Sequence, residues 1–150
     1  MFADLSGFTS LSEQLDPETL SEIVGDVITR LSRVVDHHGG TVLNYAGDAI
    51  LAGFGIPESS GDDAERALAA ALDMRSTLAA HLPSLPPVAH GLTLHIGVNS
   101  GHAIARYTGA SAHVAYTVFG DAVNTAQRLE AAAPSDEIYV GELAAKLGGA

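Results

Sequence analysis

The chain has 150 residues, of which 47% are hydrophobic, and its formal net charge is −11. These values are typical of one folded globular domain, and with seven basic residues they exclude the broad basic surface that nucleic-acid binding needs. The absence of cysteine excludes a disulfide scaffold and a thiolate metal site and fits a cytoplasmic location, and no apolar run approaches the roughly 20 residues of a membrane span.

Apolar periodicity and turn residues predict ten elements. In chain order they are a strand at 2–5, a helix at 17–38, strands at 41–45 and 49–54, a helix at 61–82, strands at 92–100, 103–107 and 114–118, a helix at 121–133 and a strand at 137–140. Long helices mixed with hairpins favour an α+β fold, in which helices pack on a mostly antiparallel sheet. No repeat or linker divides the chain, so we expect a single domain over residues 1–150.

Two aspartates lie beside glycines at predicted strand ends, far apart in the chain. Asp4 lies in the segment FADLSGFT (2–9), and Asp48 lies in NYAGDA (44–49) at the tip of a predicted hairpin. Either aspartate alone is more often a turn residue than a ligand. Together they are candidates for a shared magnesium or manganese site, because hard cations prefer carboxylate oxygens and complete their shells with phosphates and water.

The glycine turn after Asp4 leads into a helix, so free backbone N–H groups near Gly7, Phe8 and Thr9 would face a phosphate. A metal site beside a phosphate cradle indicates nucleotide chemistry.

A third segment, YTVFGDAVNTAQR (116–128), runs from a strand through a glycine into a helix. Asn124 and Arg128 are four residues apart and therefore project from one helix face. The planar guanidinium of an arginine suits a phosphoryl group in a transition state. By spacing alone, however, an ordinary exposed polar pair is the more common outcome.

These segments, with GDA (47–49) and GVNSG (97–101), resemble in order and separation the catalytic domain of class III nucleotidyl cyclases, the adenylate and guanylate cyclase family. The resemblance covers nearly the whole chain, and four ordered motifs make it specific. It implies a ferredoxin-like (βαββαβ) core and a head-to-tail homodimer with active sites at the interface. It also implies that the chain is truncated at both ends, without the final hairpin that carries a phosphate-binding lysine.

The resemblance implies roles for individual residues in the conversion of ATP to cyclic AMP and pyrophosphate. Asp4, Asp48 and the carbonyl of Leu5 would bind two Mg²⁺ or Mn²⁺ ions, and Gly7, Phe8 and Thr9 would hold the β- and γ-phosphates. The second subunit would supply Asn124 to orient the ribose and Arg128 to stabilise charge at the α-phosphate as the 3′-hydroxyl attacks.

The chain departs from the family at the positions that contact the base. Adenylate cyclases usually carry a donor-only lysine where this chain has Asn44, and the partner position is Thr117. An asparagine amide and a threonine hydroxyl each offer a donor and an acceptor, so we expect ATP to be preferred but GTP to be used. The family's basic segment before residue 116 leaves His113 as its one candidate here, and a lone loop histidine is usually a surface residue.

Two other functions stay open. A weak or inactive cyclase-like domain could dimerise or bind nucleotide for regulation, which the missing lysines favour and the four matched polar residues oppose. A diguanylate cyclase is a distant third, because its Gly-Gly-acidic-acidic-Phe signature is absent.

Overall fold

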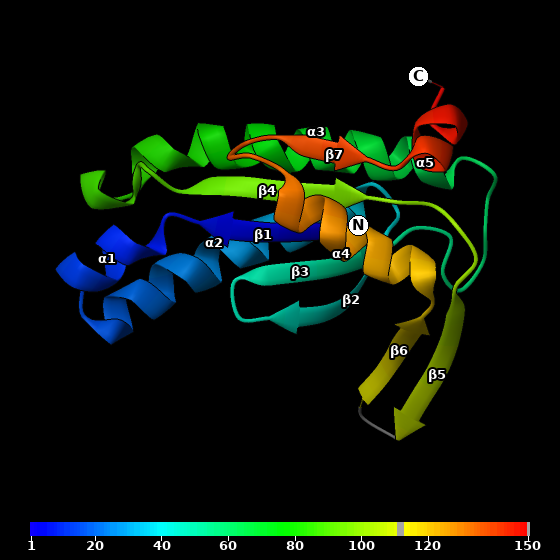
Figure 1. Cartoon of the computed structure of the whole chain (residues 1–150). Helices are drawn as coiled ribbons and strands as arrows, with labels where there is room; N and C mark the ends of the chain where they lie inside the picture. The colour runs from blue at the N-terminus through cyan, green and yellow to red at the C-terminus, as the bar shows by residue number, and fades with distance from the viewer. Residues whose placement is uncertain (111–112, 150) are drawn as a thin grey trace.

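The computed structural model of the chain describes the backbone of residues 1–110 and 113–149 and the side chains of 1–107 and 117–149 (Figure 1). Its main sheet has the strand order β2-β3-β1-β4-β7. These strands are β1 (Phe2–Ser6), β2 (Thr41–Ala46), β3 (Ala49–Gly53), β4 (Thr93–Val98) and β7 (Ile138–Val140). All neighbouring pairs are antiparallel except β4 and β7. The expected mostly antiparallel α+β sheet is therefore confirmed.

The helices divide between the two faces of this sheet. The buried side chains of α2 (Pro17–His37) and α3 (Asp63–His81) join one core with the strands, whereas α4 (Asp121–Ala132) crosses in front of β4 and β1 (Figure 1). From β1 to β4 the chain follows the expected βαββαβ order. A short helix not given separate bounds by the sequence pattern, α1 (Phe8–Gln14), precedes α2.

The remaining elements lie at the ends of the sheet. A two-stranded ribbon of β5 (Ile104–Ala110) and β6 (His113–Phe119) extends away from the main sheet (Figure 1). Short 3₁₀ turns at Leu82–Ser84 and Pro87–Ala89 connect α3 to β4, and α5 (Glu142–Leu147) follows β7. None of the described helices combines the length and the apolar character that crossing a bilayer requires.

Local chemistry explains why α2 begins and packs where it does. The Asp16 side chain accepts a hydrogen bond from the Thr19 amide at 2.7 Å, and Pro17 occupies the first helical position. The inward residues of α2 are buried and recur at helical spacing, namely Ile23, Val27, Leu31, Val34 and Val35. The part of this stripe from Val27 to Val35 and the alanine-rich inner face of α3 cover one side of the sheet, so that face forms the apolar core.

Candidate active site

Alternation along β1 separates an apolar face of the sheet from a polar one. Ala3 and Leu5 are buried in the core with α2 and α3. Successive strand residues point to opposite faces, so Phe2, Asp4 and Ser6 point to the other side, where they are half-buried. The candidate site is built on this second face.

Strand register places several candidate residues on that same face. Asp4 lies opposite Ala49 on β3 and opposite His95 on β4. Directly opposed residues share a face, and Leu51, two residues after Ala49, lies opposite Asn44. Asn44 and Asp4 therefore project from one side of the sheet, with β3 between their strands.

The turn between β2 and β3 brings Asp48 next to Asp4. Gly47 has a φ of 63° in the first position of a two-residue turn, where a hairpin favours glycine. The backbone amide of Leu5 donates to the carbonyl of Asp48 at 3.0 Å, which fixes the turn against β1. The two candidate carboxylates, 44 residues apart in sequence, thus come from adjacent strand ends.

The Asp4 carboxyl has one buried oxygen to which no described residue donates. Its Oδ1 atom is buried and has no hydrogen-bond partner among the described residues. Burial raises the pKa of Asp4, and the negative charge of Asp48 raises it further. A buried oxygen next to a second carboxylate is favourable only if a cation or a proton neutralises it.

These residues fit a divalent cation by their donor chemistry. Two carboxylates and the Leu5 carbonyl offer oxygen ligands, which Mg²⁺ and Mn²⁺ prefer. In the described part of the chain no group of three or more His, Asp or Glu side chains has the geometry to hold a metal ion. Mg²⁺ commonly uses only one or two carboxylates plus substrate phosphates and water, so the pair is sufficient.

A third carboxylate, Glu130 of α4, also belongs to this cluster. Burial raises the pKa of Glu130, and the charge of Asp4 raises it further. The sequence analysis did not include Glu130 among the candidate site residues, because an acidic residue on a predicted helix most often faces solvent. The spacing along α4 indicates its position, because Glu130 follows the buried Ala126 by four residues and so lies on the inward face of the helix.

The candidate phosphate cradle lies directly after β1. Gly7 has a φ of 98°, and a side chain there would meet the Gly91 carbonyl oxygen at 2.7 Å, so only glycine suits this corner. The helix α1 begins at Phe8, which is half-buried, while Thr9 is exposed. The expected turn into a helix beside Asp4 is therefore present.

The outward face of α4 carries the candidate polar pair. Asn124 and Arg128 are exposed, and neither side chain makes a hydrogen bond or an ion pair with the described residues. Thr117 on β6 and Asn44 on β2 are also exposed. Within one chain, then, the carboxylates come together, but Asn124 and Arg128 face solvent. The side chain of His113 lies outside the described residues.

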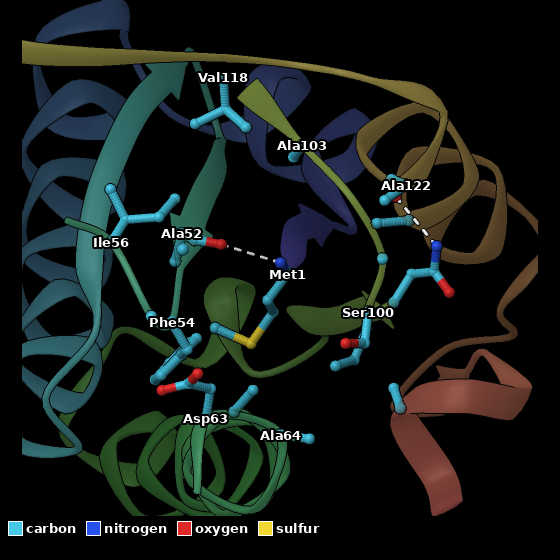
Figure 2. Close-up of a pocket in the computed structure, with 18 of the residues that line it drawn as sticks. Met1, Ala52, Phe54, Ile56, Asp63, Ala64, Ser100, Ala103, Val118 and Ala122 are labelled. Carbon is cyan, nitrogen blue, oxygen red and sulfur yellow. Dashed lines mark hydrogen bonds between the residues drawn. The ribbon is translucent and has the colours of Figure 1, made fainter. Parts of the chain in front are cut away.

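A cavity of about 600 Å³ lies apart from this cluster, between the ends of β3 and β4, the base of the ribbon and α3 (Figure 2). Its walls are mainly apolar, and the carboxylate of Asp63 is already bound by Ser59, Ser60 and Arg66. None of the candidate site residues lines it. The carboxylate cluster, rather than this cavity, therefore has the groups for chemistry.

Sequence comparisons identify relatives of this arrangement. A family model described as the adenylate and guanylate cyclase catalytic domain matches residues 1–149. Adenylate cyclase 1 of Rhizobium meliloti (strain 1021) is 33% identical over 133 residues, which cover 87% of this chain and 20% of that protein. Human guanylyl cyclase C is 32% identical over 144 residues, which cover 93% of this chain and 13% of that protein. The chain spans about a fifth or less of the length of these two relatives.

Solved structures agree with this assignment. The adenylyl cyclase CyaB from P. aeruginosa superposes with a TM-score of 0.85 at 31% identity, covering 97% of this chain and 76% of the solved one. The guanylyl cyclase Cya2 gives a TM-score of 0.84 at 32% identity, covering 99% and 76%. Since the family match extends over nearly every residue and the folds coincide, the chain belongs to the adenylate and guanylate cyclase catalytic-domain family.

Proposed function

We propose that residues 1–150 act as a catalytic domain that converts ATP to cyclic AMP and pyrophosphate and also uses GTP at a measurable rate. The observation that carries this proposal is the convergence of Asp4 and Asp48, in which a buried carboxylate oxygen lacks a partner. The family relatives include both adenylyl and guanylyl cyclases, which supports the reaction class and leaves the choice of base to this chain's own residues.

The chain's oxygen ligands are proposed to act at the triphosphate. Two Mg²⁺ or Mn²⁺ ions, when bound, would lower the pKa of the ribose 3′-hydroxyl and neutralise the leaving pyrophosphate. Asp4, Asp48 and the Leu5 carbonyl would hold them. The backbone of Gly7, Phe8 and Thr9 would orient the β- and γ-phosphates beside them.

The exposed pair on α4 would act in a second copy of the chain. Asn124 would orient the ribose, and Arg128 would stabilise negative charge at the α-phosphate. The exposure of both side chains, without partners among the described residues, supports this because the described part of one chain provides them with nothing to bind. The proposal therefore includes a homodimer with a site at each end of its interface.

Base selectivity is proposed to be relaxed because of Asn44 and Thr117. Both side chains can donate and accept hydrogen bonds, so they can read adenine without strongly rejecting guanine. Asn44 lies on the Asp4 face of the sheet, and β2, which carries it, contacts β6, which carries Thr117.

The test is incubation with ATP or GTP and Mn²⁺, followed by chromatography of the products. Wild-type protein should form cyclic mononucleotides, and Asp48→Asn should lower turnover by at least about 10²-fold while leaving the fold intact. A matched control is Asp36→Asn, which removes an exposed carboxylate from α2 and should leave the rate unchanged.

Each other result has a defined meaning. Full activity of Asp48→Asn would contradict the metal assignment. Nucleotide binding without any product would favour the alternative of a regulatory cyclase-like domain, and a cyclic dinucleotide would indicate a diguanylate cyclase.

A further inference from the structure

The side chain of His95 connects three segments that surround the carboxylate cluster. Its Nδ1 atom lies 2.5 Å from the carbonyl oxygen of Ala133, directly after α4, and its Nε2 atom lies 2.8 Å from the Oγ atom of Ser6 on β1. The Ser6 hydroxyl also lies 2.8 Å from the Thr93 hydroxyl. One imidazole on β4 thus holds the end of β1 and the end of α4 together.

The carbonyl partner fixes the direction of one bond, and the directions of the others follow for a neutral imidazole. A carbonyl oxygen can only accept, so Nδ1 of His95 carries a hydrogen and donates to Ala133. In the neutral ring Nε2 must then accept from the Ser6 hydroxyl. Ser6 has used its hydrogen in that bond, so it accepts from Thr93. With the ring neutral, this arrangement satisfies every member of the chain from Thr93 to Ala133.

The two segments held by His95 carry the two groups of residues proposed to act in catalysis, the metal-binding residues and the polar pair of α4. Ser6 follows Leu5 and lies two residues from Asp4, which faces His95 across the strands. Ala133 ends the helix that carries Asn124 and Arg128. Elsewhere along α4, Asn99 donates to the Ala122 carbonyl at 3.1 Å, and Gly97 allows the backbone at Ala126 to approach β4 closely.

We propose that His95 is a positioning residue which fixes the metal-binding end of β1 relative to helix α4. This inference rests on the proposed function. In the proposed homodimer, the carboxylates and α4 of one chain serve different active sites, so His95 of each chain connects the two sites through a single side chain.

Two conservative substitutions of His95 each remove one of its two hydrogen bonds and keep the other. In His95→Gln, the side-chain oxygen can accept from Ser6, but nothing replaces the donor to Ala133. In His95→Asn, the amide nitrogen can donate to Ala133, but the Ser6 bond is lost. We expect His95→Gln to lower kcat roughly tenfold with little change in Mn²⁺ affinity, because α4 loses its anchor. We expect His95→Asn to weaken Mn²⁺ binding roughly tenfold, because the end of β1 loses its anchor.

The experiment measures Mn²⁺ binding to each nucleotide-free protein by the loss of the free-ion EPR signal, and kcat by product chromatography. His90→Gln is the matched control, since the exposed His90 side chain bonds to the Leu85 carbonyl and to no other described residue, and should change neither quantity. If both His95 variants lose the same quantity, or if neither loses anything, the positioning role is wrong.

A spectroscopic measurement on the wild type keeps the inference testable even if a variant does not fold. Two-bond ¹H–¹⁵N NMR correlations should show the hydrogen of His95 on Nδ1, and a hydrogen on Nε2 alone would overturn the bonding scheme. The measurements of Mn²⁺ binding and of the His95 tautomer do not require the protein to turn over substrate. Wild-type protein that forms no cyclic nucleotide would thus count against the proposed function, while these two readouts still decide on His95.

Discussion

Carboxylates of this chain differ in role through their surroundings rather than their residue type. Hydrogen bonds from Ser60 to Asp62 and from Ser59 to Asp63 lower the pKa values of these two carboxyls. Arg66, which bonds to them at 3.0 and 2.6 Å, lowers both pKa values further. Asp4 has no such partner, and burial raises its pKa instead. The sequence distinguished Asp4 through its motif, but it gave no sign that Arg66 would order the start of α3.

At the base-contacting position, we expect Asn44→Lys to raise the preference for ATP over GTP about tenfold, equivalent to about 1.4 kcal/mol. A lysine ammonium only donates, so it suits the N1 acceptor of adenine and opposes the N1–H donor of guanine. The measurement is the ratio of kcat/KM for the two nucleotides. Asn44→Gln keeps both a donor and an acceptor and is the control, and an unchanged ratio in Asn44→Lys would contradict the assignment.

Helix α4 lies against β4 with almost no space between the two backbones. A Cβ atom at Gly97 would lie 2.3 Å from the Ala126 carbonyl oxygen and 2.4 Å from the Glu130 amide nitrogen. The close approach seats Glu130 beside Asp4 and sets where Asn124 and Arg128 project. Glycine at this position therefore has a positional role for the whole helix.

We expect Gly97→Ala to lower the free energy of unfolding by about 1–3 kcal/mol, because α4 must move away from the sheet. Cyclase activity should fall with it. Urea unfolding followed by circular dichroism measures the stability. Gly25→Ala is the control of opposite sign, because Gly25 lies inside α2 with nothing within 4 Å of its added methyl group and should stabilise by about 0.5–1 kcal/mol. Equal effects at both glycines would contradict the close packing of α4.

Two histidine–aspartate contacts join α2, with the residue that caps its C-terminus, to α3. His38 lies 2.9 Å from Asp73, and His81 lies 2.7 Å from Asp26. Partial burial alone would raise the pKa of Asp26, but hydrogen bonds from Arg30 and His81 outweigh it and hold the pKa below its usual value of 3.8.

From this shift we expect Asp26→Asn to lower stability at pH 7 by about 0.5 kcal/mol, a small value because the carboxylate is 47% exposed. A lowered folded-state pKa means that the stabilisation is complete above about pH 4 and is lost as pH falls through the folded value. Urea unfolding of wild type and variant between pH 7 and pH 2.5 should therefore converge at the acid end. A difference that grows toward low pH would contradict the sign of the shift.

On the scale of the whole molecule, the element order and the carboxylate pair were predictable because both depend on short-range patterns in the sequence. Helical stripes, alternation and glycine turns gave nearly every element, and the spacing of motifs gave the family. The position of Glu130 and the bonds of His95 were not predictable, because they depend on how closely α4 approaches β4. The side-chain cluster at Arg66 likewise depends on tertiary contacts with the His38 and Gly39 carbonyls.

The proposed dimer makes a quantitative prediction for mixed proteins. Asp48→Ala and Arg128→Ala should each be inactive alone. After equal mixing and random exchange, half of the dimers contain one of each chain, and each of these has one intact site. The mixture should recover about a quarter of wild-type activity per chain, which titration of one variant into the other measures. No recovery, once exchange is demonstrated, would contradict sites that are shared between chains.

The alternation along β1 also affects how this protein can change over evolutionary time. Inward positions such as Ala3 and Leu5 are restricted by volume, so any apolar side chain of similar size keeps the fold. In the proposed metal site, the intervening position of Asp4 is restricted by chemical identity instead. Two different restrictions thus alternate along one strand, and solved relatives that share 31% and 32% of their residues with this chain keep its fold.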